Sequence, residues 1–211
     1  MKKFTHFDLF DRRRIEKNEE FWRDQCGLKI DRQDIIVLGA GNQEYSRGII
    51  FPKELLVLSN NHPHEFLCAK MKERFPIDVD GDLDKQIIKN VRWPNSHSYL
   101  VYFRDRPEAD LESAGLNAND VGGKKFSGIT CAERLIYEWQ YFWETGEHLD
   151  QHSITICSGS LKSNDFVVSV NCHGGKVRIG WLCSTEYSDK LRIRFASVDK
   201  GRDLRTRLVT M

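Results

Sequence analysis

The 211-residue sequence lacks the patterns that mark membrane-spanning and secreted chains. It holds no run of 18 apolar residues, so no transmembrane helix is predicted. Its first residues, MKKFTHFDLFDRRR, place charges where a signal peptide needs an apolar centre, which argues against a secretion signal. We therefore expect a cytoplasmic protein with no membrane partner.

Paired cysteines and prolines are also scarce. The six cysteines are spread along the chain and form no CxxC motif, which gives no support to a zinc clip or a redox pair. Reduced, buried thiols are the default in such a chain. It has only five prolines and no repeat or low-complexity tract, whereas 11% of its residues are aromatic. This composition is typical of an ordered globular protein.

A large net charge is missing too, because the formal net charge is only +1. The charge is nevertheless unevenly distributed. Residues 151–211 hold ten Lys and Arg against five Asp and Glu, a net of +5, which leaves −4 for residues 1–150. An excess of this kind can mark an anion-binding end of the molecule, although a few solvated arginines produce the same imbalance.

The N-terminal half is predicted to mix helices and strands. Apolar periodicity and turn residues indicate helices over 11–25, from 61 or 62 to 75, and from 83 to about 91, where Asp82 caps the helix and Ile88 and Val91 face inward. Strands are expected over 34–41, over 47–59 as one or two strands interrupted at Pro52, and over 96–104. Residues 105–127 are rich in Asp, Asn, Gly and Lys, and predict a loop.

The C-terminal half carries stronger signals. Thr130 and Glu133 form a capping box before an apolar stripe, and Gly146 stands where a helix-terminating glycine belongs. From residue 153 on the pattern is that of strands. Gly174-Gly175 predicts a two-residue hairpin turn, which pairs His173 with Lys176 and, further out, Phe166 with Cys183. In this register one face is apolar and the other is polar near the turn.

These patterns predict an α+β fold. An antiparallel sheet of about four strands, over about 153–196, is covered by a long helix over about 131–145 and joined to a mixed helix/strand N-terminal half. We expect one domain over 1–211, with a division into subdomains 1–120 and 121–211 as the alternative.

The outward face of the predicted sheet is the leading candidate site. It would gather His173, Lys176, Arg178, Arg192 and Arg194 on one surface. Asn171 lies near its end, and the tail adds Arg202, Arg205 and Arg207. No aromatic residue alternates onto this face, so stacking of single-stranded bases is not predicted. The alternative is an ordinary solvated face of a half-buried sheet.

Cys131 is a second candidate, as a catalytic nucleophile. It follows the Thr130 cap, where backbone N–H groups and the helix dipole favour a thiolate. His148 and His152 come at the opposite end of the helix, so a catalytic base would have to come from elsewhere. The alternative is a small residue packed under the sheet.

Two further segments contain metal-ligand side chains, but neither matches a metal motif. NNHPHEF supplies His62, His64 and Glu65 without the cysteine pair that a zinc deaminase needs. DVDGDLD places aspartates at positions 78, 80, 82 and 84 but lacks the glycine and glutamate of an EF-hand loop. We expect solvated helix starts here, with loose divalent binding as the alternative for the aspartates, and predict neither a metal site nor a cofactor.

Three functions remain open from the sequence. The first is a non-enzymatic binding module that uses the basic sheet face and the C-terminal tail for an anionic ligand, a nucleic acid or an acidic protein. The second is a small cysteine-dependent enzyme with Cys131 as its nucleophile. The third is a homo-oligomeric structural protein with Trp22, Trp93 and Phe126 as exposed interface residues.

Overall fold

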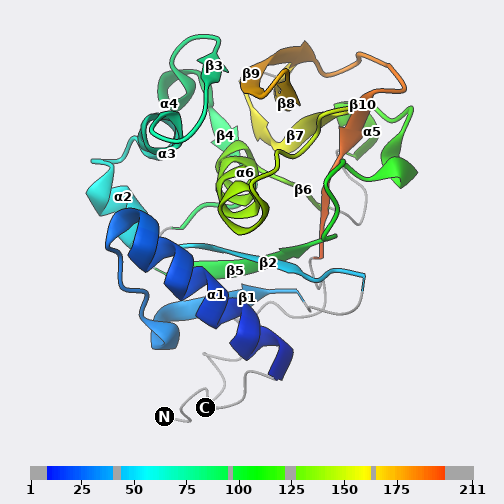
Figure 1. Ribbon diagram of the computed structural model, residues 1–211. Helices are drawn as coiled ribbons and strands as arrows, with labels where there is room; N and C mark the ends of the chain where they lie inside the picture. Colours follow the sequence, from blue (N-terminus) through cyan, green and yellow to red (C-terminus); the bar gives the residue numbers. More distant parts are fainter. Residues whose placement is uncertain (1–8, 40–43, 95–96, 122–126, 163–164, 198–211) are drawn as a thin grey trace.

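A helix lies between two β-sheets at the centre of the protein (Figure 1). The computed structural model describes residues 9–39, 44–94, 97–121, 127–162 and 165–197. The α+β class and the mixed N-terminal half are confirmed, as is the packing of the long helix on the C-terminal antiparallel strands.

The element bounds are as follows. The described helices are α1 (Leu9–Cys26), α2 (Glu54–Leu58), α3 (Pro63–Lys72), α4 (Leu83–Gln86), α5 (Ala118–Val121) and α6 (Cys131–Thr145), with 3₁₀ turns at Arg32–Asp34 and Leu111–Ser113. The described strands are β1 (Ile35–Leu38), β2 (Arg47–Phe51), β3 (Ile77–Val79), β4 (Lys89–Asn90), β5 (Ser98–Phe103), β6 (Ser127–Gly128), β7 (Ile154–Leu161), β8 (Phe166–His173), β9 (Lys176–Cys183), β10 (Leu191–Ile193) and β11 (Phe195–Ala196).

Two N-terminal predictions are wrong in part. The segment after Pro52 is the short helix α2 instead of a second strand. The helix capped by Asp82 has a single turn, because the chain turns extended at Ile87 and then pairs with β7 as β4. Ile88 and Val91, expected to face inward, are 70% and 50% exposed. Pairing with a distant strand outweighs local helical periodicity here.

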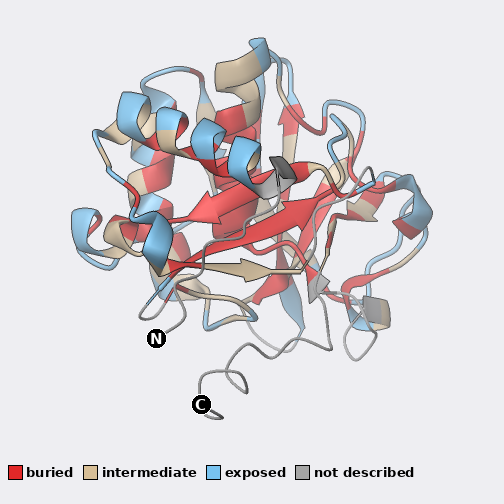
Figure 2. Ribbon diagram, turned by 90° about the horizontal axis from the view of Figure 1, so that it is seen from below, coloured by how far each residue is buried: buried red, intermediate tan, exposed pale blue. Residues whose placement is uncertain are grey.

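The first sheet has the order β1-β5-β2, and α1 lies along its β2 edge. Asn18 of α1 donates a hydrogen bond to the Gly48 carbonyl and accepts one from the Ile50 N–H. Trp22 donates its indole N–H to the Ile50 carbonyl. The helix thereby satisfies the backbone groups that an edge strand leaves open. In Figure 2 the outer side of α1 is exposed, whereas the strands beneath it are buried.

The second sheet has the order β10-β7-β8-β9-β3, and β4 also pairs with β7. Strands β7, β8 and β9 are antiparallel, and the hairpin register from Phe166/Cys183 to His173/Lys176 is confirmed. Strand β10, which the sequence predicts as a fourth antiparallel strand, instead runs parallel to β7. Strand β3 runs parallel to β9 at the other edge.

Helix α6 is buried on all sides from Cys131 to Gln140, because it packs between the two sheets. Its charged residues are therefore interior and must be paired. Glu133 accepts hydrogen bonds from the Arg92 guanidinium and the Tyr99 hydroxyl. Burial alone would raise the pKa of Glu133, but the adjacent Arg92 charge lowers it below its usual value. No described helix is both long enough and apolar enough to cross a membrane.

Candidate functional site

The basic residues predicted on one face of the sheet do not share a face. Arg178 of β9 and Arg192 of β10 point to opposite sides. Arg192 lies opposite Thr155 in the β10–β7 register. Thr155 is buried and bonds the Asp150 carboxylate, next to α6. Leu191 and Ile193 face the other way, into a second apolar cluster. Both faces of the sheet are covered in this region. The alternation of apolar residues in the sequence therefore could not predict which face packs against α6.

Arg194 is the clearest correction. It was expected on the solvent face but is only 1% exposed. Its guanidinium donates to Asp150 Oδ1 at 2.7 Å and to the carbonyls of Arg106 and Pro107 at 2.8 Å. Burial alone would raise the pKa of Asp150, but the charges of Arg194 and Arg134 lower it below its usual value. Arg194 is therefore part of an interior ion network instead of the solvent-exposed face on which the sequence predicted it.

The remaining predicted residues do lie on a solvent-accessible face. His173 and Lys176 are exposed at the hairpin turn, and Arg178 is exposed two residues further along β9. Asn171 of β8 is directly opposite Arg178, and Asp78 of β3 is opposite it on the other side. Paired residues of neighbouring strands point to the same face, so Arg178 stands between an amide and a carboxylate.

A hollow of about 340 Å³ opens on this face. Besides Arg178, its lining includes Asp78 and Asp80 at one side and Ser169 and Asn171 at the other. Its lining also includes Gly180, which pairs with Ser169 in the row next to Arg178. Because Gly180 has no side chain, it leaves space on this face of the sheet, beside Arg178.

The face is charged with both signs rather than basic. Asp78 and Asp80 compensate the two cations Lys176 and Arg178, and both aspartates are exposed. Within the described residues, no ion pair joins Arg178 to either aspartate. The sequence missed this arrangement because the β3–β9 pairing joins residues about 100 positions apart. The apolar-acidic-apolar pattern Ile77-Asp78-Val79 after Pro76 was the available signal for a strand.

Cys131 does not have the environment expected of a nucleophile. It is fully buried, its backbone N–H is taken by Ser160 Oγ at 2.8 Å, and burial raises the pKa of its thiol well above its usual value. Desolvation by burial is the largest influence on the pKa of this thiol, and it disfavours the thiolate that the prediction requires. The exposed cysteine is Cys183, whose pKa is lowered by the hydrogen bond to Thr185.

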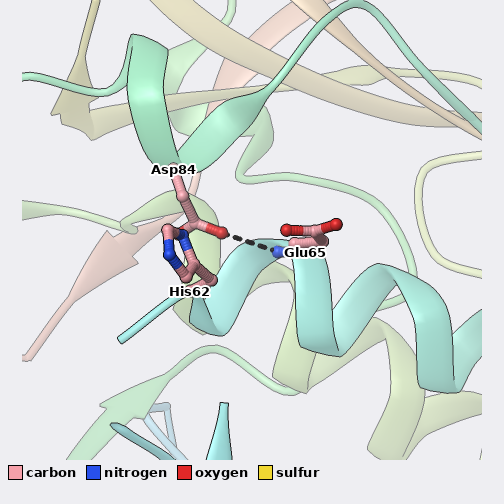
Figure 3. A group of neighbouring side chains, drawn as sticks. All are labelled: His62, Glu65 and Asp84. Atoms are coloured by element: carbon pink, nitrogen blue, oxygen red, sulfur yellow. Dashed lines mark hydrogen bonds between the residues drawn. The ribbon is translucent and has the colours of Figure 1, made fainter. Parts of the chain in front are cut away.

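The two segments rich in metal-ligand side chains come together in the fold. His62, Glu65 and Asp84 form one cluster at the start of α3 (Figure 3). His62 is solvated as expected, but His64 is 1% exposed and its Nδ1 lies 2.6 Å from Asp84 Oδ1. Burial alone would raise the pKa of Asp84, but the hydrogen bond and charge of His64 lower it.

Of the aromatic residues expected at an interface, Trp22 and Trp93 are not exposed as predicted. Trp22 is completely buried where α1 packs on β2, and Trp93 is half-buried against Phe51 and His64. Phe126 lies outside the described residues, as do Arg202, Arg205 and Arg207 of the tail.

Comparison with known proteins finds no match: no protein-family model, curated protein or solved structure matches this chain. Its function must be argued from the geometry of these sites.

Proposed function

We propose that the protein is a binding module whose ligand occupies the hollow on the β3–β8–β9 face. The observation that carries this proposal is the position of Arg178, which stands between Asn171 and Asp78 at the rim of a depression floored by Gly180. The volume of about 340 Å³ is at the lower end of small-ligand sites, which span about 300–1,000 Å³. The ligand is therefore compact.

The charges of the lining define the ligand chemistry. The Arg178 guanidinium offers a forked donor that suits a carboxylate. Asp78 and Asp80 favour an ammonium group on the same ligand. Asp78 and Arg178 belong to adjacent strands, which lie about 4.8 Å apart, so one short ligand can reach both side chains. A zwitterionic dipeptide is of suitable size, and its amide can bond Asn171 and Ser169.

A polyanion fits the face less well. Nucleic-acid affinity comes largely from phosphates that meet a continuous row of Lys and Arg. Here Asp78 and Asp80 would repel those phosphates, and Arg192 and Arg194 lie on the other side of the sheet. The sequence suggested an anionic ligand or an acidic partner. We now propose a ligand that carries a positively charged group as well as a negatively charged one.

We place this binding module in the cytoplasm. The six cysteines are free thiols and four are buried, as suits a reducing compartment. The interior position of Cys131 is why we favour binding over cysteine-dependent catalysis.

Isothermal titration calorimetry with glycylglycine tests the proposal. Arg178→Gln removes one charge-assisted hydrogen-bonding partner, worth about 1.5–3 kcal/mol, so it should weaken binding by roughly 10- to 100-fold. Asp78→Asn should weaken it through the ammonium group. Lys190→Gln, an exposed cation away from the hollow, is the matched control and should leave the affinity unchanged.

A capped probe, N-acetyl-glycylglycine amide, separates charge recognition from general peptide binding. The proposal expects the capped peptide to bind at least about tenfold more weakly, since both charges are gone. Equal binding of the two probes, or equal binding by wild type and Arg178→Gln, contradicts it. Retention of the wild type on heparin at low salt, lost in Arg178→Gln, would instead indicate a polyanion site on this face.

A further inference from the structure

The cluster at the start of α3 shares no residue with the lining of the hollow and combines three side chains that ligate metals. His62 is the residue before the first turn of α3, Glu65 belongs to that turn, and Asp84 comes from α4 (Figure 3). One ligand atom from each lies within 4.8 Å of the others. In the described part of the chain, no hydrogen bond or ion pair occupies the side chain of His62 or Glu65.

Asp84 is held in place by the helix start. Its Oδ2 accepts the Glu65 N–H at 2.8 Å, and its Oδ1 accepts the His64 N–H at 3.2 Å. Asp84 thereby caps α3 from outside, a role that the His62 side chain does not fill. The contact between His64 Nδ1 and Asp84 Oδ1 further fixes the carboxylate, as outer-shell hydrogen bonds do for metal ligands.

We infer that His62, Glu65 and Asp84 bind a divalent transition-metal ion, with Zn²⁺ the best suited. An imidazole beside two carboxylates is a nitrogen-and-oxygen ligand set, which favours Zn²⁺ over Ca²⁺ and Mg²⁺. Zinc lies about 2.0–2.2 Å from such atoms, so the ligand atoms must approach to about 3.4 Å of one another. His62 and Glu65 are exposed and make this adjustment, while Asp84 stays fixed.

The electrostatics set the character of the site. The two carboxylates attract a divalent cation. The positive end of the α3 dipole opposes the cation, but the N–H groups of His64 and Glu65 are already satisfied by Asp84. Three protein ligands leave one position of a tetrahedral ion open, where water or a small anion binds. We therefore expect an exchangeable, partly solvated ion.

Metal titration of the full chain tests the inference, with Zn²⁺ followed by calorimetry and Co²⁺ by its visible absorption. His62→Asn and Glu65→Gln are the informative variants, because both residues are exposed and neither caps the helix. Asp84→Asn is avoided, since loss of the cap would perturb α3. His97→Asn is the matched control: His97 is an exposed histidine 2.8 Å from an Asp34 carboxylate oxygen. Cys183→Ser controls for the exposed thiol.

The wild type should bind one Zn²⁺, and His62→Asn and Glu65→Gln should each raise the dissociation constant at least about tenfold. His97→Asn and Cys183→Ser should retain wild-type affinity, and Ca²⁺ should not compete. An unchanged affinity in both His62→Asn and Glu65→Gln, with circular dichroism showing them folded, overturns the inference. So does loss of the Zn²⁺ signal in Cys183→Ser, or the absence of any Zn²⁺ binding by the wild type.

Discussion

Replacing Gly180 by valine should stabilise the fold and impair ligand binding at once. Gly180 lies in β9 and pairs with Ser169 on the face that carries the hollow. A Cβ at this position would meet only Ser169 Oγ, at 3.8 Å, which is an ordinary van der Waals contact. The backbone is not in the left-handed region, so a valine can adopt it without strain.

The two expected effects have opposite signs. Glycine inside a strand costs roughly 0.5–1 kcal/mol relative to alanine, and β-branched residues suit strands, so Gly180→Val should raise the free energy of unfolding by about that amount. The valine methyl groups occupy the floor of the hollow. Binding of glycylglycine should therefore weaken by about tenfold or more, equivalent to about 1.4 kcal/mol.

Urea denaturation and calorimetry measure the two quantities on the same sample. Gly159→Ala in β7 is the control glycine, because its Cβ would lie 2.8 Å from the Gly128 carbonyl oxygen and 2.9 Å from that of Ile129. Such overpacking should destabilise by about 1–3 kcal/mol. A Gly180→Val variant that loses stability like Gly159→Ala, or that binds glycylglycine as tightly as the wild type, refutes the reasoning.

Three other predictions concern the interior. Arg194→Met should lower the free energy of unfolding, measured by urea denaturation, by about 3–5 kcal/mol, because it leaves the buried Asp150 carboxylate undercompensated. Arg178→Met should change it by less than about 0.5 kcal/mol. Equal losses of stability in the two variants would contradict the burial of Arg194. Glu133 has a folded-state pKa below its unfolded value, so its stabilisation is complete above about pH 4.3 and is lost as pH falls through the folded pKa. The free energy of unfolding should fall as the pH is lowered below about 4.3, and less steeply in Glu133→Gln; parallel pH profiles would argue against this ion pair. Iodoacetamide should label Cys183 in the native protein and spare Cys131, and mass spectrometry that finds native labelling of Cys131 contradicts its burial.

The parts of the fold that follow from local rules were predictable. Gly174 and Gly175 both have positive φ, as a tight hairpin turn requires, and the alternation beyond them leaves one register. The capping box at Thr130 and the left-handed Gly146 fix both ends of α6. In each case the signal and the structure that it specifies lie within a few residues of one another.

The parts that depend on distant partners were not predictable. Leu191 and Ile193 alternate with arginines, and this pattern fits either face of a sheet that is covered on both sides. The burial of Arg194 depends on its ion pair with Asp150. Asp150 has a left-handed backbone conformation (φ 54°), which the neighbouring sequence does not predict. Likewise, Asp84 reaches the first turn of α3 only because the one-turn helix α4 packs beside it in the folded chain.

The most direct test of the ligand site is amide chemical-shift mapping of the ¹⁵N-labelled protein during titration with glycylglycine. The account predicts that the shifting resonances cluster at the hollow, on Asp80, Asn171, Arg178 and Gly180. No shift at about 10 mM peptide, tenfold above a weak dissociation constant of about 1 mM, would contradict it. Shifts confined to residues away from the β3–β8–β9 face would contradict it equally.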